Sequence, residues 1–141
     1  MHRDFKTFMI YYYGGDFVSL LEQLNDKQAE AASCVDHHLR IIAGAGSGKT
    51  RVVTTRIAYL IDELHVYPNK ILAITFTNKA AKEMKERVEN ILGDVASAVQ
   101  ISTIHSFCVR LLREDILEIG YPRNFTILDS DDQKKYLKRC L

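Results

Sequence analysis

Ala43-Gly44-Ala45-Gly46-Ser47-Gly48-Lys49-Thr50 is the stretch of this sequence that decides its fold. An apolar run, Leu39 to Ala43, precedes it, and a run with helical spacing, Arg51 to His65, follows it. Strand, glycine-rich turn and helix in this order predict a phosphate-binding loop. Glycines let successive backbone N–H groups point inward, and the start of the helix adds free donors and partial positive charge. The alternative is a glycine-rich turn with a surface lysine, and the flanking strand and helix patterns argue against it.

Lys49 and Thr50 carry the chemistry expected of such a loop. The Lys49 ammonium would reach the β- and γ-phosphates of a nucleoside triphosphate, and the Thr50 hydroxyl would bind Mg²⁺. These two are therefore the candidate catalytic residues, and Thr50 is the candidate metal ligand. Phosphate contacts are expected along the whole loop: Ala43, Gly44, Ala45, Gly46, Ser47, Gly48, Lys49 and Thr50. The common pattern begins with glycine where Ala43 stands, and a small residue is expected to serve there because the strand ends at it.

The composition describes one soluble globular domain. The chain has 141 residues, of which 47% are hydrophobic and 26% charged, and its formal net charge is +1. This length suits one core rather than two ordinary domains, and the charge argues neither for nor against nucleic acid. Three widely spaced cysteines suggest reduced thiols rather than disulfides or a metal site. Because no apolar run approaches membrane-spanning length and residues 1–10 lack a signal-peptide core, we expect a cytoplasmic protein without membrane contact.

Apolar runs alternate with helical patterns along the rest of the chain. Asn25 is expected to cap a helix over Asp26–Cys34, with Gln28 at the capping-box position. Ile71–Thr75 predicts a buried strand, since it has no polar alternation. Asn78 is expected to cap the next helix, which Gly93 ends.

The pattern continues to the end of the sequence. Val99–Ser102 predicts a third strand, and His105–Ile119 predicts a helix that ends before Gly120. Asp129–Asp132 is expected to cap a last helix. Strand–helix alternation with continuously apolar strands predicts an α/β fold with a parallel sheet and flanking helices.

Several of these segments resemble motifs of the UvrD/PcrA/Rep family of superfamily 1 DNA helicases, in the same order and at similar spacing. The resemblance runs from about Phe17 to the last residue and implies a P-loop NTPase fold of the RecA-like type, incomplete in this chain. The matching segments are 24–28 (an adenine-recognising Q motif), 43–51 (motif I), 71–81 (motif Ia), 101–107 (the next DNA-contacting motif) and 125–133 (entry to an inserted accessory subdomain).

The resemblance implies ATP and Mg²⁺ as cofactors and adds two nucleotide-binding residues. Gln28 would recognise adenine, because its amide both donates and accepts hydrogen bonds. Helix capping is the alternative role of Gln28, and one amide could serve both. Arg51 would approach the base or the phosphates, and its alternative is a solvated helix position.

The resemblance also implies a rim that faces single-stranded DNA. Phe76 could stack on a base, which tolerates any sequence, whereas its alternative is a core phenylalanine that covers the sheet. His105 has no nucleophile or carboxylate partner in view, so we reject a catalytic role for it. Ile104 stands where the family usually has an aromatic residue, which weakens the case for stacking there. The implied DNA-binding residues are Thr75, Phe76, Thr77, Asn78, Lys79, Thr103, His105 and Ser106.

Hydrolysis of ATP needs further groups that these motifs do not supply. An acid at a strand end must hold Mg²⁺, another group must position water, and an arginine must meet the transition-state charge. Asp129 follows an apolar run, but a helix cap explains it better. We therefore expect that this polypeptide alone neither hydrolyses ATP nor unwinds duplex DNA. We also expect exposed sheet edges and uncovered apolar faces.

The sequence thus predicts three regions: a leader of unknown role (1–16), the N-terminal part of a RecA-like ATP-binding motor domain (17–119) and the start of an inserted subdomain (120–141). The full-length protein would be an ATP-dependent DNA helicase moving 3′ to 5′ on single-stranded DNA and acting at duplex junctions. Three alternatives stay open: the motor subunit of a helicase–nuclease, a truncated non-catalytic relic that binds nucleotide or DNA, and a small nucleotide kinase. Repair, replication restart and plasmid replication all fit these motifs, as does any oligomeric state.

Overall fold

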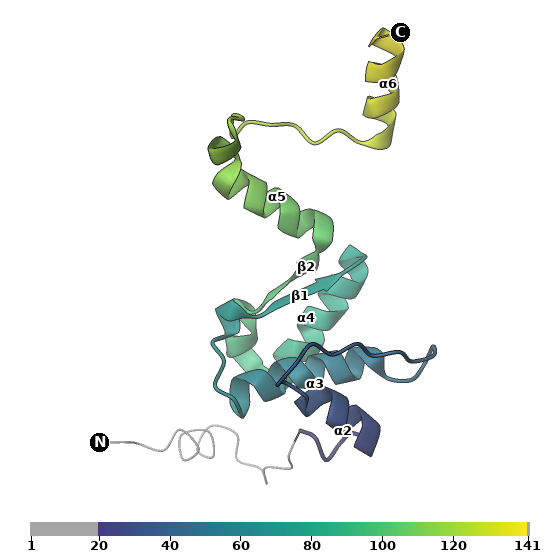
Figure 1. Cartoon of the computed structure of the whole chain (residues 1–141), viewed down its shortest axis with the longest axis vertical. Helices are drawn as coiled ribbons and strands as arrows, with labels where there is room; N and C mark the ends of the chain where they lie inside the picture. The colour runs from purple at the N-terminus through teal and green to yellow at the C-terminus, as the bar shows by residue number, and fades with distance from the viewer. Residues whose placement is uncertain (1–19, 141) are drawn as a thin grey trace, which may run out of the picture. The chain divides into compact units, whose positions relative to one another are not determined.

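The computed structural model describes residues 20–140, so the leader predicted for 1–16 lies outside the described residues (Figure 1). These residues form two compact units, one ending at Ser102 and the other beginning at Thr103. The first unit holds α2 (Asp26–Ser33), α3 (Lys49–Asp62), η1 (Pro68–Lys70), β1 (Leu72–Thr75), α4 (Asn78–Leu92), η2 (Gly93–Ala98) and most of β2 (Gln100–Thr103). The second holds α5 (Ile104–Asp115), η3 (Ile116–Ile119) and α6 (Ser130–Cys140).

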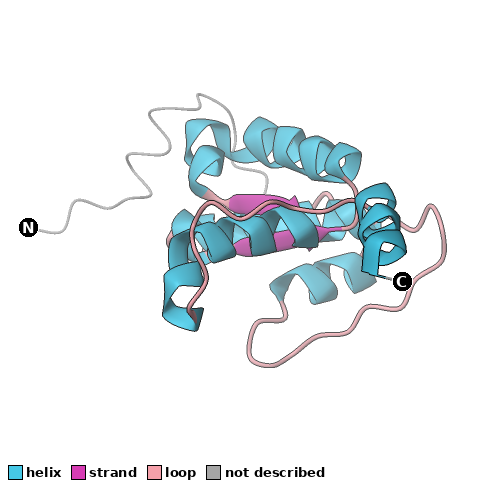
Figure 2. Ribbon diagram, turned by 90° about the horizontal axis from the view of Figure 1, so that it is seen from above, coloured by secondary structure: helices cyan, strands magenta, loops and turns pink. Residues whose placement is uncertain are grey.

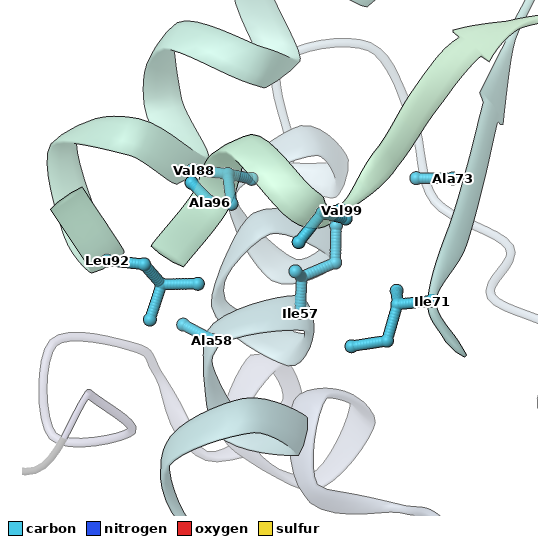
Figure 3. Close-up of a cluster of buried hydrophobic side chains, with 8 residues drawn as sticks. All are labelled: Ile57, Ala58, Ile71, Ala73, Val88, Leu92, Ala96 and Val99. Atoms are coloured by element: carbon cyan, nitrogen blue, oxygen red, sulfur yellow. The ribbon is translucent and has the colours of Figure 1, made fainter. Parts of the chain in front are cut away.

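The first unit is a mixed α/β structure, as the sequence predicts. Its two strands lie side by side in a parallel sheet (Figure 2). Helices α3 and α4 and the turn η2 cover one face of this sheet, and their apolar side chains meet those of the strands (Figure 3). The buried cluster consists of Ile57, Ala58, Ile71, Ala73, Val88, Leu92, Ala96 and Val99.

The opposite face of β1 is open. Ile71 and Ala73 are each 8% exposed, whereas Leu72 and Ile74 on the alternate positions are 43% and 42% exposed. Successive side chains of a strand point to opposite faces, so one face is in the core and the other meets solvent. The prediction of a buried strand over Ile71–Thr75 is therefore correct for one face and wrong for the other, since Leu72 and Ile74 are apolar but exposed. This is where the structure has uncovered apolar surface of the kind expected from the sequence.

The segment before the loop is not a strand, which corrects the prediction for Leu39–Ala43. Leu39, Ile41 and Ile42 are 41%, 40% and 83% exposed, and β1 pairs with β2 instead. A strand needs a neighbour to receive its N–H and C=O groups, and no described strand lies beside these residues. The segment is apolar, as a strand would be, but it does not form one. An apolar run alone cannot predict a strand, because a strand also needs a partner from elsewhere in the chain.

Helix α4 ends where the sequence predicts, at Gly93, whose φ is 61°. The predicted cap is wrong by one residue: Thr77, not Asn78, is the N-cap. Thr77 has an extended backbone, and its hydroxyl accepts a hydrogen bond from the Ala80 N–H at 3.1 Å. Since that hydroxyl satisfies a free donor of the first turn, Asn78 becomes the first helical residue.

The second unit also follows its predicted order with local differences. The helix predicted for His105–Ile119 begins at Ile104 and gives way after Asp115 to the 3₁₀ turn η3, which ends at Gly120 with φ 80°. The Asp129 carboxylate accepts hydrogen bonds from the N–H groups of Asp131 and Asp132, at 2.9 and 2.8 Å. This confirms the cap expected for the last helix. Across residues 20–140 the helices are all too short or too polar to cross a membrane.

Candidate functional site

The loop 43–50 has the backbone of an anion-binding turn. Gly46 and Gly48 take positive φ angles of 75° and 82°, and Gly48 is the N-cap of α3. Ser47 bridges the turn, donating from its hydroxyl to the Gly44 carbonyl at 2.8 Å. Among residues 20–140 no side chain caps α3, so no cap there takes the backbone donors of its first turn. The described geometry therefore fits a phosphate group at this helix start.

The Lys49 ammonium lies against the same loop. Its Nζ donates to the carbonyls of Ala43 at 2.9 Å and Gly44 at 2.5 Å. The side chain is thus folded over the loop, with its charge balanced by two carbonyl dipoles. To contact a phosphate, Lys49 must exchange these carbonyls for phosphate oxygens, which are stronger partners because they are charged. Thr50 is exposed in the first turn of α3, where its hydroxyl is accessible.

Gln28 joins helix α2 to the loop. It completes the predicted capping box, since Asn25 Oδ1 accepts from the Gln28 N–H at 2.9 Å and Gln28 Oε1 accepts from the Asn25 N–H at 3.2 Å. Its Nε2 also donates to the Ser47 carbonyl at 3.0 Å. One amide therefore caps its helix and contacts the loop 19 residues away.

Gly48 lies beside this contact and has a left-handed backbone. A Cβ placed on Gly48 would lie 2.8 Å from Gln28 Nε2, closer than a real contact allows. Gly44, by comparison, has open space where its Cβ would be. The left-handed backbone is the reason that this position needs glycine, and a side chain here would in addition push the flexible end of Gln28 away from Ser47.

Two arginines of α3 reach the backbone around α2. Arg51 Nη2 donates to the Gln23 carbonyl at 2.6 Å, so in this structure it contacts the chain just before α2. Arg56, which sequence reasoning missed, donates from Nη1 to the carbonyls of Ala31 at 3.1 Å and Ala32 at 3.3 Å, and to that of Cys34. No local pattern points to Arg56, because its partners are 22 to 25 residues away.

The candidate DNA-binding segment of the first unit lies where β1 ends and α4 begins. Phe76 is 95% exposed, so among the described residues nothing packs over its ring. Thr75 ends β1, Thr77 caps α4, and Asn78 begins that helix. Thr75, Phe76 and Thr77 thus form a short connection at the carboxyl end of a parallel strand, where α/β proteins place ligands.

Lys79 follows on the exposed surface of α4. Its ammonium is 4.0 Å from Glu83, and two further pairs repeat this spacing, Lys82 with Glu86 and Lys85 with Glu89, both at 3.8 Å. Exposed pairs of this kind contribute little and exchange readily with solvent. These pairs lie on a solvated face of α4, and Lys79 can leave its weak pair for a phosphate.

The second unit places Thr103, His105 and Ser106 at the start of α5. Thr103 is buried and caps the helix: its Oγ1 accepts from the Ser106 N–H at 3.2 Å and lies 2.9 Å from Ser106 Oγ. His105 and Ser106 are exposed. The hydroxyls of Thr103 and Ser106 therefore satisfy each other, and Ser106 keeps an accessible surface.

The structure offers fewer candidate ligands for a metal ion than for a phosphate group. Within residues 20–140 no cluster of three or more His, Cys, Asp or Glu side chains is placed to hold an ion. Thr50 is the candidate ligand that the loop supplies, and Asp129 is engaged as a helix cap. β1 and β2 both end in threonine rather than in an acid.

Comparison with known proteins gives a consistent result. The family described as UvrD/REP helicase N-terminal domain matches residues 24–141. Proteins named ATP-dependent DNA helicase PcrA, from Staphylococcus aureus and from Staphylococcus epidermidis, are 57% identical to this chain over 123 residues. The match covers 87% of this chain but 17% of those relatives, so the chain spans about a sixth of their length.

Proposed function

Because the chain belongs to the UvrD/REP helicase N-terminal domain family, we propose that it is the ATP-binding part of a DNA helicase that moves 3′ to 5′ along single-stranded DNA. The observation that carries this proposal is the contact between Gln28 and the loop that begins α3. It brings a group able to recognise a base next to a turn able to hold phosphates.

The nucleotide would be held at three points. The β- and γ-phosphates meet the backbone donors of the loop and the start of α3, and Lys49 transfers its hydrogen bonds from the loop carbonyls to the phosphate oxygens. Mg²⁺, which neutralises phosphate charge when bound, would contact the Thr50 hydroxyl. Gln28 and Arg51 would then contact the base end of the nucleotide.

The DNA would meet the connection between β1 and α4. Phe76 is free to stack on a base, and Lys79 at the helix start would contact a phosphate. Thr103, His105 and Ser106 at the start of α5 are proposed as further contacts to the backbone of the strand. Residues 17–119 would belong to the motor domain and 120–141 to an inserted subdomain, in a cytoplasmic protein that acts on single strands and duplex junctions.

Titration of a ribose-labelled fluorescent ATP into the 141-residue chain, with Mg²⁺ present, tests the nucleotide half of the proposal. We expect saturable binding that Lys49→Ala weakens between about tenfold and hundredfold, as expected for the loss of a charged hydrogen bond. Lys82→Ala, an exposed lysine of α4, is the matched control and should bind like the parent chain. Absence of nucleotide binding by the parent would refute the proposal.

We also expect the chain alone to show no turnover of ATP, since the strand-ending acid and the arginines needed for hydrolysis are not among its motifs. Release of inorganic phosphate is the measurement, with and without single-stranded DNA. DNA-stimulated turnover that Lys49→Ala abolishes would contradict this expectation.

A further inference from the structure

Helix α2 is too short to be stable by itself. It has eight residues, and isolated helices of that length are marginal in water. Its last turn carries no basic residue of its own to meet the negative end of the helix dipole. Within α2, the Ser33 hydroxyl donates to the carbonyls of Ala29 at 2.9 Å and Glu30 at 3.4 Å, and the carbonyls of Ala31 and Ala32 are left for donors outside the helix.

Arg56 of α3 supplies that group. Its Nη1 lies 3.1 Å from the Ala31 carbonyl and 3.3 Å from the Ala32 carbonyl, and it also donates to the Cys34 carbonyl. The guanidinium is partly buried, and Ala32 is fully buried at the same end of the helix. Arg56 thus acts as a C-terminal cap provided by a different helix.

Gln28 lies in the first turn of α2, and the carbonyls that Arg56 contacts lie at its other end. Ala31 and Ala32 follow Gln28 by only three and four residues, so about one helical turn joins the two ends. Gln28 in turn donates to the Ser47 carbonyl at 3.0 Å. Arg56 lies in α3, and the loop leads directly into that helix. The arginine therefore fixes α2 against the helix that begins at the proposed phosphate site.

We propose that Arg56 is a positioning residue for base recognition: it holds α2 so that the Gln28 amide faces the nucleotide. This inference rests on the proposed function, since it assumes that Gln28 contacts the base. Arg56 itself touches no nucleotide. Its loss should therefore weaken the preference for adenine while leaving the grip on the triphosphate unchanged.

The test compares ribose-labelled fluorescent ATP and GTP as ligands of the 141-residue chain and four variants: Gln28→Ala, Arg56→Met, the double variant and Arg87→Met. Methionine keeps the apolar stem of arginine and removes its donors. We expect the parent to prefer ATP and Gln28→Ala to reduce that preference by about tenfold, the worth of one good hydrogen bond. Arg56→Met should reduce it by a similar factor, with unlabelled tripolyphosphate competing as well as in the parent.

The double variant separates positioning from general stability. If Arg56 acts through Gln28, Arg56→Met has no further effect on base preference in the Gln28→Ala background. Arg87→Met changes an exposed arginine of α4 and should match the parent. If Arg56→Met loses helical circular dichroism, Arg56→Lys replaces it, because lysine keeps the charge without the planar fork that reaches several carbonyls.

Three results would overturn the inference: an unchanged ATP preference in Arg56→Met, an equal loss of ATP, GTP and tripolyphosphate affinity, or effects that add in the double variant. A parent chain that binds neither nucleotide refutes the proposed function instead. A parent that binds both equally refutes base recognition by Gln28, and the inference with it.

Discussion

The proposed nucleotide-binding segment (43–50) and the proposed DNA-binding segment (75–79) of the first unit are built in opposite ways. Around the loop 43–50, the polar side chains are engaged with their neighbours: Gln28 with the Ser47 carbonyl and Lys49 with two loop carbonyls. At the connection 75–79, Phe76 is presented to solvent with 95% of its surface exposed. The first segment is organised by contacts within the chain, whereas the second presents a side chain to solvent at the connection between a strand and a helix.

This difference predicts different responses to substitution. In the loop 43–50, a small change in backbone shape disturbs several hydrogen bonds at once, so the free energy of unfolding and the affinity for ligand change together. In the connection 75–79, an exposed side chain can be removed without loss of packing, so the affinity for ligand changes while the stability does not. The four predictions below test this contrast, from the largest expected effect to the smallest.

Gly48→Ala should lower the free energy of unfolding by about 2–3 kcal/mol. About 1–2 kcal/mol comes from forcing a residue with a Cβ into the left-handed region at φ 82°. The rest comes from the Gln28 amide, which must move from a Cβ 2.8 Å away and so lose its bond to Ser47. Urea unfolding measures the change.

Two neighbouring glycines provide the controls for this prediction. Gly46→Ala has a positive φ but open space around its Cβ, so it should show the backbone strain alone. Gly44→Ala has neither and should be close to neutral. Equal effects at Gly44 and Gly48 would show that the loop is not organised by these contacts.

Phe76→Ala should weaken binding of a single-stranded oligothymidine by about 1–3 kcal/mol, the worth of one stacked base. The melting temperature should stay the same, because the ring is exposed and packs on nothing in the core. Fluorescence anisotropy of a labelled oligonucleotide measures the affinity. Tyr67→Ala is the matched control: its ring is 75% exposed and lies before β1, at the other end of the strand. A similar loss at Tyr67 would mean that exposed aromatic surface, not this corner, binds the DNA.

The features that the sequence predicted correctly are local ones. The capping box joins Asn25 to Gln28, three residues later. The Asp132 N–H likewise donates to Asp129, three residues earlier. The C-terminal end of α4 follows from Gly93, which ends the helix. Each of these depends on a few consecutive residues, and the information for them is therefore present in the pattern.

Apart from the cap of α4, which was misplaced by one residue, the features that the sequence missed are long-range. Leu39–Ala43 has the composition of a strand, but a strand exists only where a second one pairs with it. The contacts of Arg56 with the end of α2 and of Arg51 with Gln23 join residues more than 20 positions apart. The exposure of Phe76 could not be predicted for the same reason, because the burial of a ring depends on which distant residues pack over it.

Thr77→Ala should lower the free energy of unfolding by about 1 kcal/mol, the typical loss of an N-cap. The Thr77 hydroxyl accepts from the Ala80 N–H at 3.1 Å, and alanine leaves that donor without its partner. Thr77→Ser keeps the acceptor and should retain most of the stability. Thermal unfolding followed by circular dichroism measures both variants. A full loss in Thr77→Ser would assign the effect to the methyl group of threonine rather than to the cap.

Asp62→Asn should have the smallest effect and the opposite sign, a gain in stability of a few tenths of a kcal/mol at neutral pH. Asp62 ends α3 at the negative pole of that helix, and its pKa is raised above the ordinary 3.8, first by burial and then by the neighbouring Glu63, while His65 partly opposes the shift. A raised pKa means that the folded state binds this proton more tightly than the unfolded state does, so the stabilisation is complete at pH below 3.8 and is lost as the pH rises through the raised value. The parent chain should therefore lose stability relative to Asp62→Asn over that range, as urea unfolding at a series of pH values would show. Both ligand affinities should stay unchanged, because Asp62 lies at the end of α3 opposite the loop; a change in ATP affinity would mean that the contacts around the loop extend along the whole helix.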